Sequence, residues 1–359
     1  MAIGAWAFFG NKNGIQASSR TVYDIYLYYF LFLHLEIPFE VRVDLLFAVL
    51  LAIYIAAFGG SFLIGKRFDR AVRESFKRPL AETFRNWLFA MPTVTSMLLF
   101  SIIGLALFQE SQGIQTGSLN YSNPYLFFVD LSYASVVEEI GSRIIPLGTF
   151  LVIHALIFNR NRFAGMTRGQ MARTVLFGFL LPDHFRRNLG LNTVNKVGFR
   201  RSIGRGDWFI VLLTALSFGL AHYFGGAGWG VGKISLEFLT GMVMGPIFLL
   251  YGAPATILIH WMFNSYTSSY YLLGAPEMLI VLPVLAILIT GVTGWIGLFG
   301  KGILGLWLRI RPTRVTTMLR NVPAAYCGQC GQQFVDNALY CRQCGAARVV
   351  VQVGSASNM

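Results

Sequence analysis

The sequence LLFAVLLAIYIAAFGGSFLIG at residues 45–65 contains no charged side chain and is long enough to cross a lipid bilayer as a helix. Four further uncharged runs of similar length cover residues 87–108, 208–224, 253–273 and 278–300. Three more apolar segments carry charged side chains, and they cover residues 21–39, 125–158 and 231–251. The pattern predicts an all-α polytopic membrane protein with about eight transmembrane helices.

Composition supports a membrane protein and excludes several other classes. Hydrophobic residues make up 55% of the 359-residue chain and charged residues only 13%, with a mean hydropathy of +0.58. The 31 Phe, 15 Tyr and 7 Trp residues are too many for a disordered chain, and four cysteines are too few for a disulfide scaffold. The net charge of +13 comes from basic residues spread between apolar segments, which is typical of orientation in a membrane. No nucleic-acid partner is therefore expected.

Basic residues are unevenly distributed among the segments that connect the apolar runs. They gather in residues 66–85, 159–173, 183–207 and 301–320, whereas residues 109–124, 225–230 and 274–277 contain neither Lys nor Arg. Because basic loops stay on the cytoplasmic side of a membrane, both chain termini are predicted to be cytoplasmic. Residues 172–181 are apolar but too short to span, and they are predicted to lie at the interface or to re-enter the membrane.

All four cysteines fall in two Cys-x-x-Cys pairs, each followed by Gly: Cys327, Cys330, Cys341 and Cys344. Two tight pairs joined by a short hairpin bring four thiolates together as tetrahedral zinc requires. Disulfides are the alternative, but they need an oxidising compartment, and the predicted orientation places this tail in the cytoplasm. The sequence therefore predicts a small structural zinc ribbon over residues 323–359, after a membrane core over residues 1–322. Such modules commonly dock a protein partner.

Charged side chains inside a predicted span indicate a catalytic or structural role, because burying them in hydrocarbon costs free energy. Glu138 and Glu139 are adjacent, and Arg143 follows Glu139 by four positions. On a helix Glu139 and Arg143 share a face in the favourable order for an ion pair, whereas Glu138 lies about 100° away. A pair that neutralises Glu139 leaves Glu138 as a candidate general base, and a purely structural charge network is the alternative.

Two histidines lie in two further predicted spans, each with a partner four positions away. His222 follows Phe218, and Asn264 follows His260, so each pair shares a helix face. His222 is predicted to help Glu138 hold a water molecule, and His260 with Asn264 to donate hydrogen bonds to a developing oxyanion. Two histidines and a carboxylate also match the three-ligand pattern of catalytic zinc, and the residues alone leave both mechanisms open.

Helix geometry predicts different depths in the membrane for these residues. At about 1.5 Å per residue, Glu138 lies about 9 Å from the cytoplasmic side of a hydrocarbon core about 30 Å thick, and His260 lies at a similar depth. His222 lies about 21 Å from that side when residues are counted from Trp208. Counting along the chain therefore predicts that His222 lies apart from Glu138, unless the span begins later than Trp208 or tilts or breaks near Gly219.

The motifs Glu-Glu-x-x-x-Arg at residues 138–143, Phe-x-x-x-His at 218–222 and His-x-x-x-Asn at 260–264 occur in this order on separate predicted spans. The arrangement resembles the CPBP family of intramembrane proteases, which includes the CAAX prenyl endopeptidases and bacteriocin-immunity relatives. The resemblance covers residues 125–273, and it leaves the ribbon outside the matched part.

The resemblance implies an eight-helix core that hydrolyses a peptide bond within the membrane, by glutamate-activated water or by a metal. It also implies a role for each motif residue: Glu138 as general base, His222 as its partner, His260 and Asn264 at the oxyanion, and Glu139 and Arg143 as accessory residues. By analogy, the substrate is a membrane-associated protein, among which lipidated CAAX proteins come first, and the location is a prokaryotic cell membrane.

Two other classes of function are compatible with the same residues. Buried carboxylates and histidines also relay protons or ions in transporters and channels. A membrane interaction or immunity protein that docks a partner through the ribbon would not need Glu138 at all. An intramembrane endopeptidase is the favoured hypothesis, because three separate motifs occur in full and in order.

Overall fold

The computed structural model describes residues 1–30, 33–64, 67–75, 86–119, 122–225, 228–274, 277–310, 326–334, 338 and 340–347. The chain forms two compact units, residues 1–296 and residues 297–359. The long helix α16, Glu277–Ile310, begins in the first unit and continues into the second. Pro323, where the sequence predicts that the second domain begins, lies outside the described residues.

Six helices in the described part of the chain are long and apolar enough to cross a membrane, which indicates an integral membrane protein. They are α3 (Val43–Leu63), α6 (Trp87–Ser111), the continuous run of α7 (Pro124–Glu139), η2 (Ile140–Ile144) and α8 (Ile145–Phe158), α13 (Arg205–Phe224), α14 (Gly232–Tyr251) and α16, whose apolar part is Val281–Ile303. Each of them matches one of the eight predicted spans.

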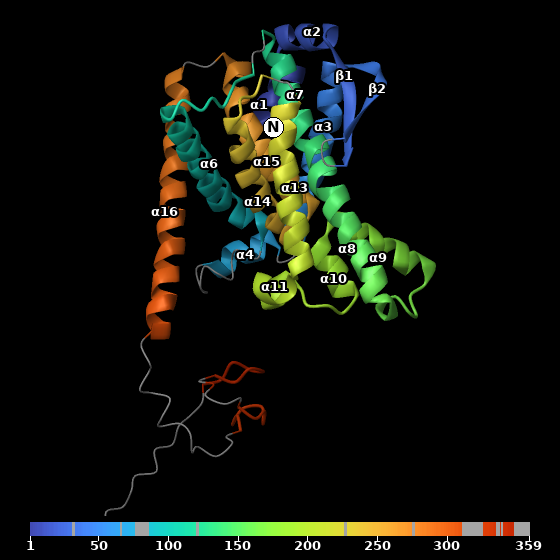
Figure 1. The fold of residues 1–359 in the computed structure, drawn as a ribbon, viewed down its shortest axis with the longest axis vertical. Coiled ribbons are helices and arrows are strands. Elements are labelled where there is room, and N and C mark those ends of the chain that lie inside the picture. The colour runs from blue at the N-terminus through green and yellow to red at the C-terminus, as the bar shows by residue number, and fades with distance from the viewer. Residues whose placement is uncertain are drawn as a thin grey trace, which may run out of the picture. The chain divides into compact units, whose positions relative to one another are not determined.

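The predicted span at residues 253–273 is a helix, α15 (Ala253–Leu273), but it is not one of these six. Its second half is rich in Ser, Thr and Tyr, which lowers its hydropathy. α15 contacts α3, α6, α7 and α14, so it lies at the centre of the bundle (Figure 1). Protein rather than lipid surrounds most of this helix, which is why its composition can be more polar.

The predicted span at residues 21–39 is wrong, because this segment forms a two-stranded antiparallel hairpin. Strand β1 (Val22–Phe30) pairs with β2 (Leu33–Arg42), with Asp24 opposite Glu40 and Tyr26 opposite Glu36. Aromatic and β-branched residues favour a strand, and Pro38 would interrupt the hydrogen bonds of a helix. The fold is therefore mostly helical rather than all-α.

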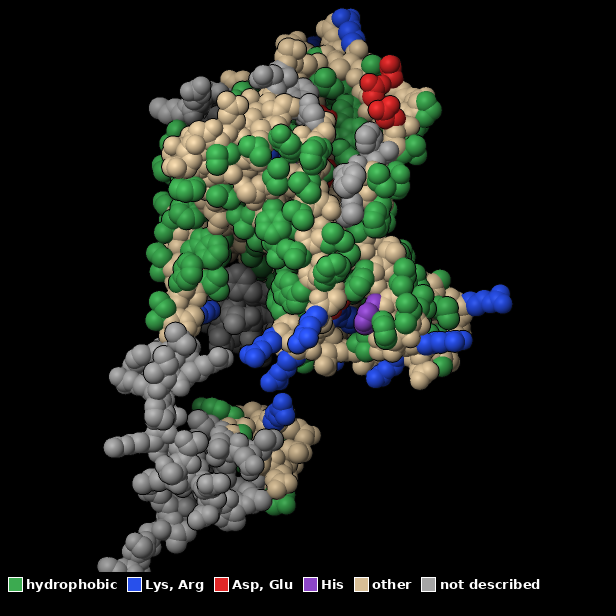
Figure 2. All heavy atoms as spheres, in the orientation of Figure 1, with side chains coloured by type: hydrophobic (Ala, Val, Ile, Leu, Met, Phe, Trp, Pro, Cys, Tyr) green, Lys and Arg blue, Asp and Glu red, His purple; other side chains and the backbone are tan. Residues whose placement is uncertain are grey.

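Short helices occupy the connections. Near the N-terminus and after α3 these are α1 (Ala2–Ala5), η1 (Trp6–Gly10), α2 (Lys12–Arg20) and α4 (Phe68–Ser75). Between α8 and α13 they are η3 (Arg160–Arg162), α9 (Arg168–Leu180), α10 (Pro182–Asn188), α11 (Val194–Val197) and α12 (Phe199–Ser202). α9 covers most of the apolar stretch 172–181 and packs against α8 and α10. Figure 2 shows basic side chains gathered at this end of the helical unit.

The core of the helical unit is aromatic on one side of α7. Phe8 stacks on Phe47 at a centroid distance of 4.4 Å, and Phe128 of α7 lies against both rings. Tyr54 of α3 is almost fully buried and donates a hydrogen bond of 2.5 Å to the carbonyl oxygen of Ser132. These contacts fix α7 against α3 and the N-terminal segment, and so position the acidic end of α7.

Candidate functional site

The motif residues lie on three helical segments that meet inside the bundle. α7 ends at Glu139, and the π-helical turn η2 (Ile140–Ile144) that follows carries Arg143. His222 lies in the last turn of α13, and His260 lies near the start of α15. A π turn in a long helix redirects nearby side chains and often accompanies a functional site.

Glu139 is the centre of a buried ion pair. Nη1 of Arg143 donates to Oε1 of Glu139 at 2.5 Å, and Nδ1 of His260 lies 2.8 Å from the same oxygen. The side chains of Glu139, Arg143 and His260 are only 0%, 2% and 7% exposed. The guanidinium of Arg143 also stacks over the ring of Phe218 at 4.2 Å. The ion pair expected from the four-residue spacing is therefore present, and it extends to His260.

Glu138 faces both histidines. Its Oε2 lies 3.5 Å from Nε2 of His260 and 3.8 Å from Nε2 of His222. This oxygen is buried and makes no hydrogen bond with any described residue. The three motifs of the sequence thus meet at one carboxylate oxygen, although each comes from a different helix.

The contacts of Nδ1 in His222 and His260 determine which nitrogen of each ring carries a hydrogen. Nδ1 of His222 lies 2.9 Å from the carbonyl oxygen of Phe218, which only accepts, so this nitrogen carries a hydrogen. Nδ1 of His260 likewise donates to the Glu139 carboxylate. In neutral rings both Nε2 atoms are then acceptors, as is Oε2 of Glu138. Three acceptors that face one another are suited to bind a water molecule, a shared proton or a metal cation.

Asn264 contacts α7 rather than the histidines. Its Nδ2 donates to the carbonyl oxygen of Leu131 and to Oγ of Ser135, both at 3.1 Å. An amide group has two hydrogens to donate, so both are used in these bonds. Asn264 therefore fastens α15 to α7 one turn away from Glu138.

The depth conflict predicted for His222 does not occur. α7 continues through η2 into α8 without a break, and Glu138 lies about 30 Å from the far end of this helix at Phe158. His222 lies about 26 Å from Arg205, where α13 begins, so the two distances agree. Gly252, between α14 and α15, lies against Leu180 at the end of α9, and His260 is only about 12 Å along α15 from it. Counting from predicted span ends failed because helix ends do not share one plane.

Tyr28 of the hairpin is a neighbour of the site that the sequence did not suggest. A Cβ atom on Gly141 would lie only 2.5 Å from Cβ of Tyr28, so the strand approaches η2 as closely as a glycine permits. Burial, followed by the nearby carboxylates of Glu138 and Asp130, raises the pKa of Tyr28, so its hydroxyl stays protonated at neutral pH. The sequence did not indicate Tyr28 because residues 21–39 were predicted to be a helical span.

Glu237 and Lys233 of α14 form a second ion pair beside the histidines. Nζ of Lys233 lies 2.7 Å from Oε1 of Glu237 and also 4.1 Å from the centre of the Trp229 ring. The Glu237 carboxylate interacts electrostatically with His222 and His260. The two charged residues that seemed to disturb this span thus pair with each other and border the candidate site.

The four cysteines form a separate candidate metal centre in the second unit. All four Sγ atoms lie within 4.8 Å of one another, and two of the distances between the pairs are 3.5 Å. In each pair the first cysteine accepts a backbone hydrogen bond from the glycine, Gly331 to Cys327 and Gly345 to Cys341, and both glycines have positive φ. Thiolates at about 2.3 Å from a tetrahedral metal would be about 3.8 Å apart, so the four cysteines fit a metal ion such as zinc.

No family model, no curated protein and no solved structure matches this chain. The function proposed below therefore depends on the motifs and on the geometry of the residues themselves.

Proposed function

We propose that this protein is an intramembrane endopeptidase that hydrolyses a peptide bond of a membrane-associated protein. The observation that carries the proposal is the position of Glu138, whose Oε2 faces Nε2 of His222 and of His260. The neighbouring Glu139 is already paired with Arg143, so only one of the two carboxylates is available as a base. Lipidated proteins of the CAAX type are one substrate class that suits such a site.

In the proposed reaction a water molecule donates one hydrogen bond to Glu138 and the other to His222. Glu138 takes a proton from the water while the oxygen attacks the carbonyl carbon of the scissile bond. The carbonyl oxygen becomes an oxyanion, and the proton on Glu138 then passes to the leaving nitrogen as the C–N bond breaks. The products are a carboxylic acid and an amine, and Glu138 returns to its starting state.

His260 is the proposed donor to the oxyanion. Glu138 and Glu139 contribute two negative charges and Arg143 one positive charge, so a single proton on His260 makes the group neutral. A neutral group is the least costly to bury. Glu139 accepts from Nδ1 of His260, and this leaves the protonated Nε2 to donate where negative charge develops. Asn264 holds α15 in place, because both its amide hydrogens contact α7.

Residues 323–359 are proposed to be a zinc ribbon with a structural role, held by Cys327, Cys330, Cys341 and Cys344. Bound zinc would cross-link the two cysteine pairs and so hold this small unit folded. We also propose that the end of the bundle with the basic connections faces the cytoplasm of a prokaryotic cell (Figure 2). Because residues 21–39 form a hairpin instead of a span, and α2 contacts α7 near its first turn, the N-terminus falls on the opposite side, and the expectation that both termini are cytoplasmic is not kept.

The direct test compares protein termini by mass spectrometry in cells that express the wild type, Glu138→Gln or Glu110→Ala. Glu138→Gln keeps the shape of the side chain and removes the base, whereas Glu110 is an exposed residue at the end of α6. New termini should appear with the wild type and with Glu110→Ala and vanish with Glu138→Gln. Termini that persist in Glu138→Gln would refute the assignment.

The same experiment separates the alternative function. If the three samples share one set of termini, and removal of residues 326–359 abolishes the cellular function, a ribbon-docked interaction protein replaces the protease. A transporter would instead show acid-dependent ion flux in liposomes without any cleaved peptide bond.

A further inference from the structure

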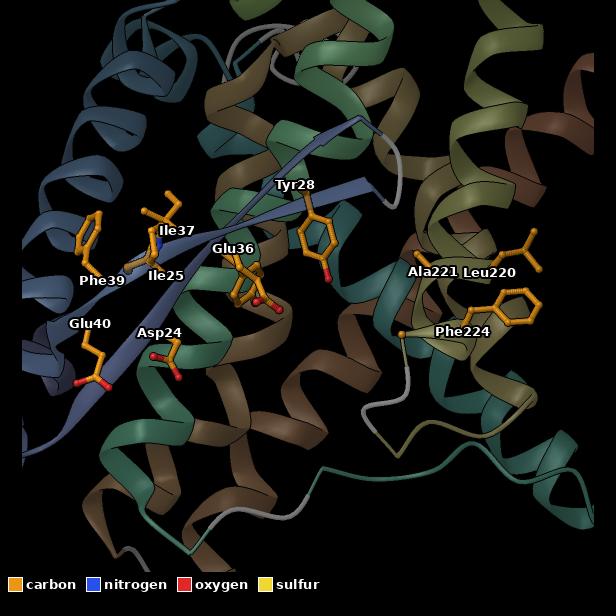
Figure 3. Close-up of a pocket in the computed structure, with 13 residues that line it drawn as sticks. Asp24, Ile25, Tyr28, Glu36, Ile37, Phe39, Glu40, Leu220, Ala221 and Phe224 are labelled. Carbon is orange, nitrogen blue, oxygen red and sulfur yellow. The ribbon is translucent and has the colours of Figure 1, made fainter.

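A large cavity lies between the hairpin and the end of α13. Its volume is about 1120 Å³. One wall is formed by Asp24, Ile25, Tyr26 and Tyr28 of β1 and by residues 36–40 of β2, and the opposite wall by Leu220, Ala221 and Phe224 of α13 together with Gly225, which follows it (Figure 3). Five consecutive residues of β2 border it, which is about 17 Å of extended chain. The cavity is therefore long enough for a peptide segment of about five residues.

The cavity adjoins the candidate catalytic residues. Ala221 and Gly225 line it, and on a helix these positions lie about 100° and 60° from His222, on the same side. Tyr28, which also lines it, lies against Gly141, three positions after Glu138. Neither Glu138 nor His222 lines the cavity, but a segment that fills it lies next to the helical turns that carry them.

The two walls differ in chemistry. The hairpin wall carries the exposed carboxylates of Asp24, Glu36 and Glu40, and none of the described lining residues is Lys or Arg. Asp24 and Glu40 are directly opposite each other, which is an unfavourable arrangement of like charges unless a cation lies nearby. The opposite wall is apolar, because Leu220, Ala221 and Phe224 line it.

We propose that this cavity binds the substrate as an extended segment, with Lys or Arg side chains against the hairpin and apolar side chains against α13. The inference rests on the proposed protease function and adds the class of substrate. An extended segment is required because the carbonyl groups of an intact helix are hydrogen-bonded and shielded. The charge preference is local, because the chain as a whole carries a net charge of +13 and repels basic peptides elsewhere.

Binding can be measured without cleavage in the Glu138→Gln protein, reconstituted in nanodiscs of phosphatidylcholine. The probes are two fluorescein-labelled dodecapeptides, one of alternating Lys and Val and one of alternating Glu and Val, and empty nanodiscs give the lipid background. Fluorescence polarisation should show saturable binding of the Lys peptide and at least tenfold weaker binding of the Glu peptide. Adding Glu36→Lys should weaken binding of the Lys peptide about tenfold, because one attraction becomes a repulsion.

The matched control is Glu110→Lys, which makes the same change of charge far along the chain from the hairpin. It should leave the affinity for the Lys peptide unchanged, and Glu36→Gln should give an intermediate loss if Glu36→Lys unfolds the hairpin. Equal binding of the two peptides, or equal affinity in Glu36→Gln and Glu110→Lys, would overturn the inference. Charge-dependent binding without any cleavage by the wild type would instead overturn the protease proposal alone.

Discussion

Removing one member of the buried pair between Glu139 and Arg143 should destabilise the helical unit strongly. The two side chains are 0% and 2% exposed, so either one left alone is a buried charge without its counter-ion. Breaking a buried pair in this way costs about 3–5 kcal/mol. At about 2–4 °C per kcal/mol, Arg143→Met or Glu139→Gln should lower Tm by about 6–20 °C.

The double variant Glu139→Gln with Arg143→Met removes both charges and should recover most of this loss. Two charges that are removed together leave no uncompensated group, so the double variant should be about as stable as the wild type or more stable by up to about 1–4 kcal/mol. Thermal unfolding of the four purified proteins in one detergent, followed by circular dichroism, completes the double-mutant cycle. Additive losses in the double variant would refute the claim that the two groups interact. His260 should also lose its orientation, so all three variants should be inactive.

Three further outcomes follow from contacts elsewhere in the molecule. Gly141→Ala should abolish cleavage, since a Cβ atom there would lie 2.5 Å from Cβ of Tyr28. The control Gly104→Ala in α6 meets no atom within 4 Å and should gain up to about 1 kcal/mol of stability. A fully active Gly141→Ala protein would show that the hairpin does not lie against η2. Asn264→Leu should lower stability by about 1–3 kcal/mol in thermal unfolding and reduce kcat less than tenfold, because its amide bonds to α7; a loss of a hundredfold or more would instead place it at the oxyanion. Metal analysis of the purified wild type should find one zinc ion per chain, and Cys341→Ser should lose it while retaining proteolysis; loss of proteolysis on chelation in Cys341→Ser would favour a catalytic metal.

The sequence determined where most of the helices lie, because an uncharged run of about 20 residues records its own membrane span. It also determined the ion pair of Glu139 with Arg143 and the two matching cysteine pairs, since both depend on spacings of three or four residues. Such features are local, and the neighbours along the chain are also the neighbours in space.

The hairpin and the meeting of the motifs were decided by the tertiary structure. An apolar segment with scattered charges is equally compatible with a helix and with a strand, and the hairpin forms here because its tyrosines pack on α7. Glu139 and His260 are 121 positions apart, so no periodicity could bring them within 2.8 Å. The depth of His222 and the cavity beside it depend on where whole helices end relative to one another, and only the packing of the bundle decides that.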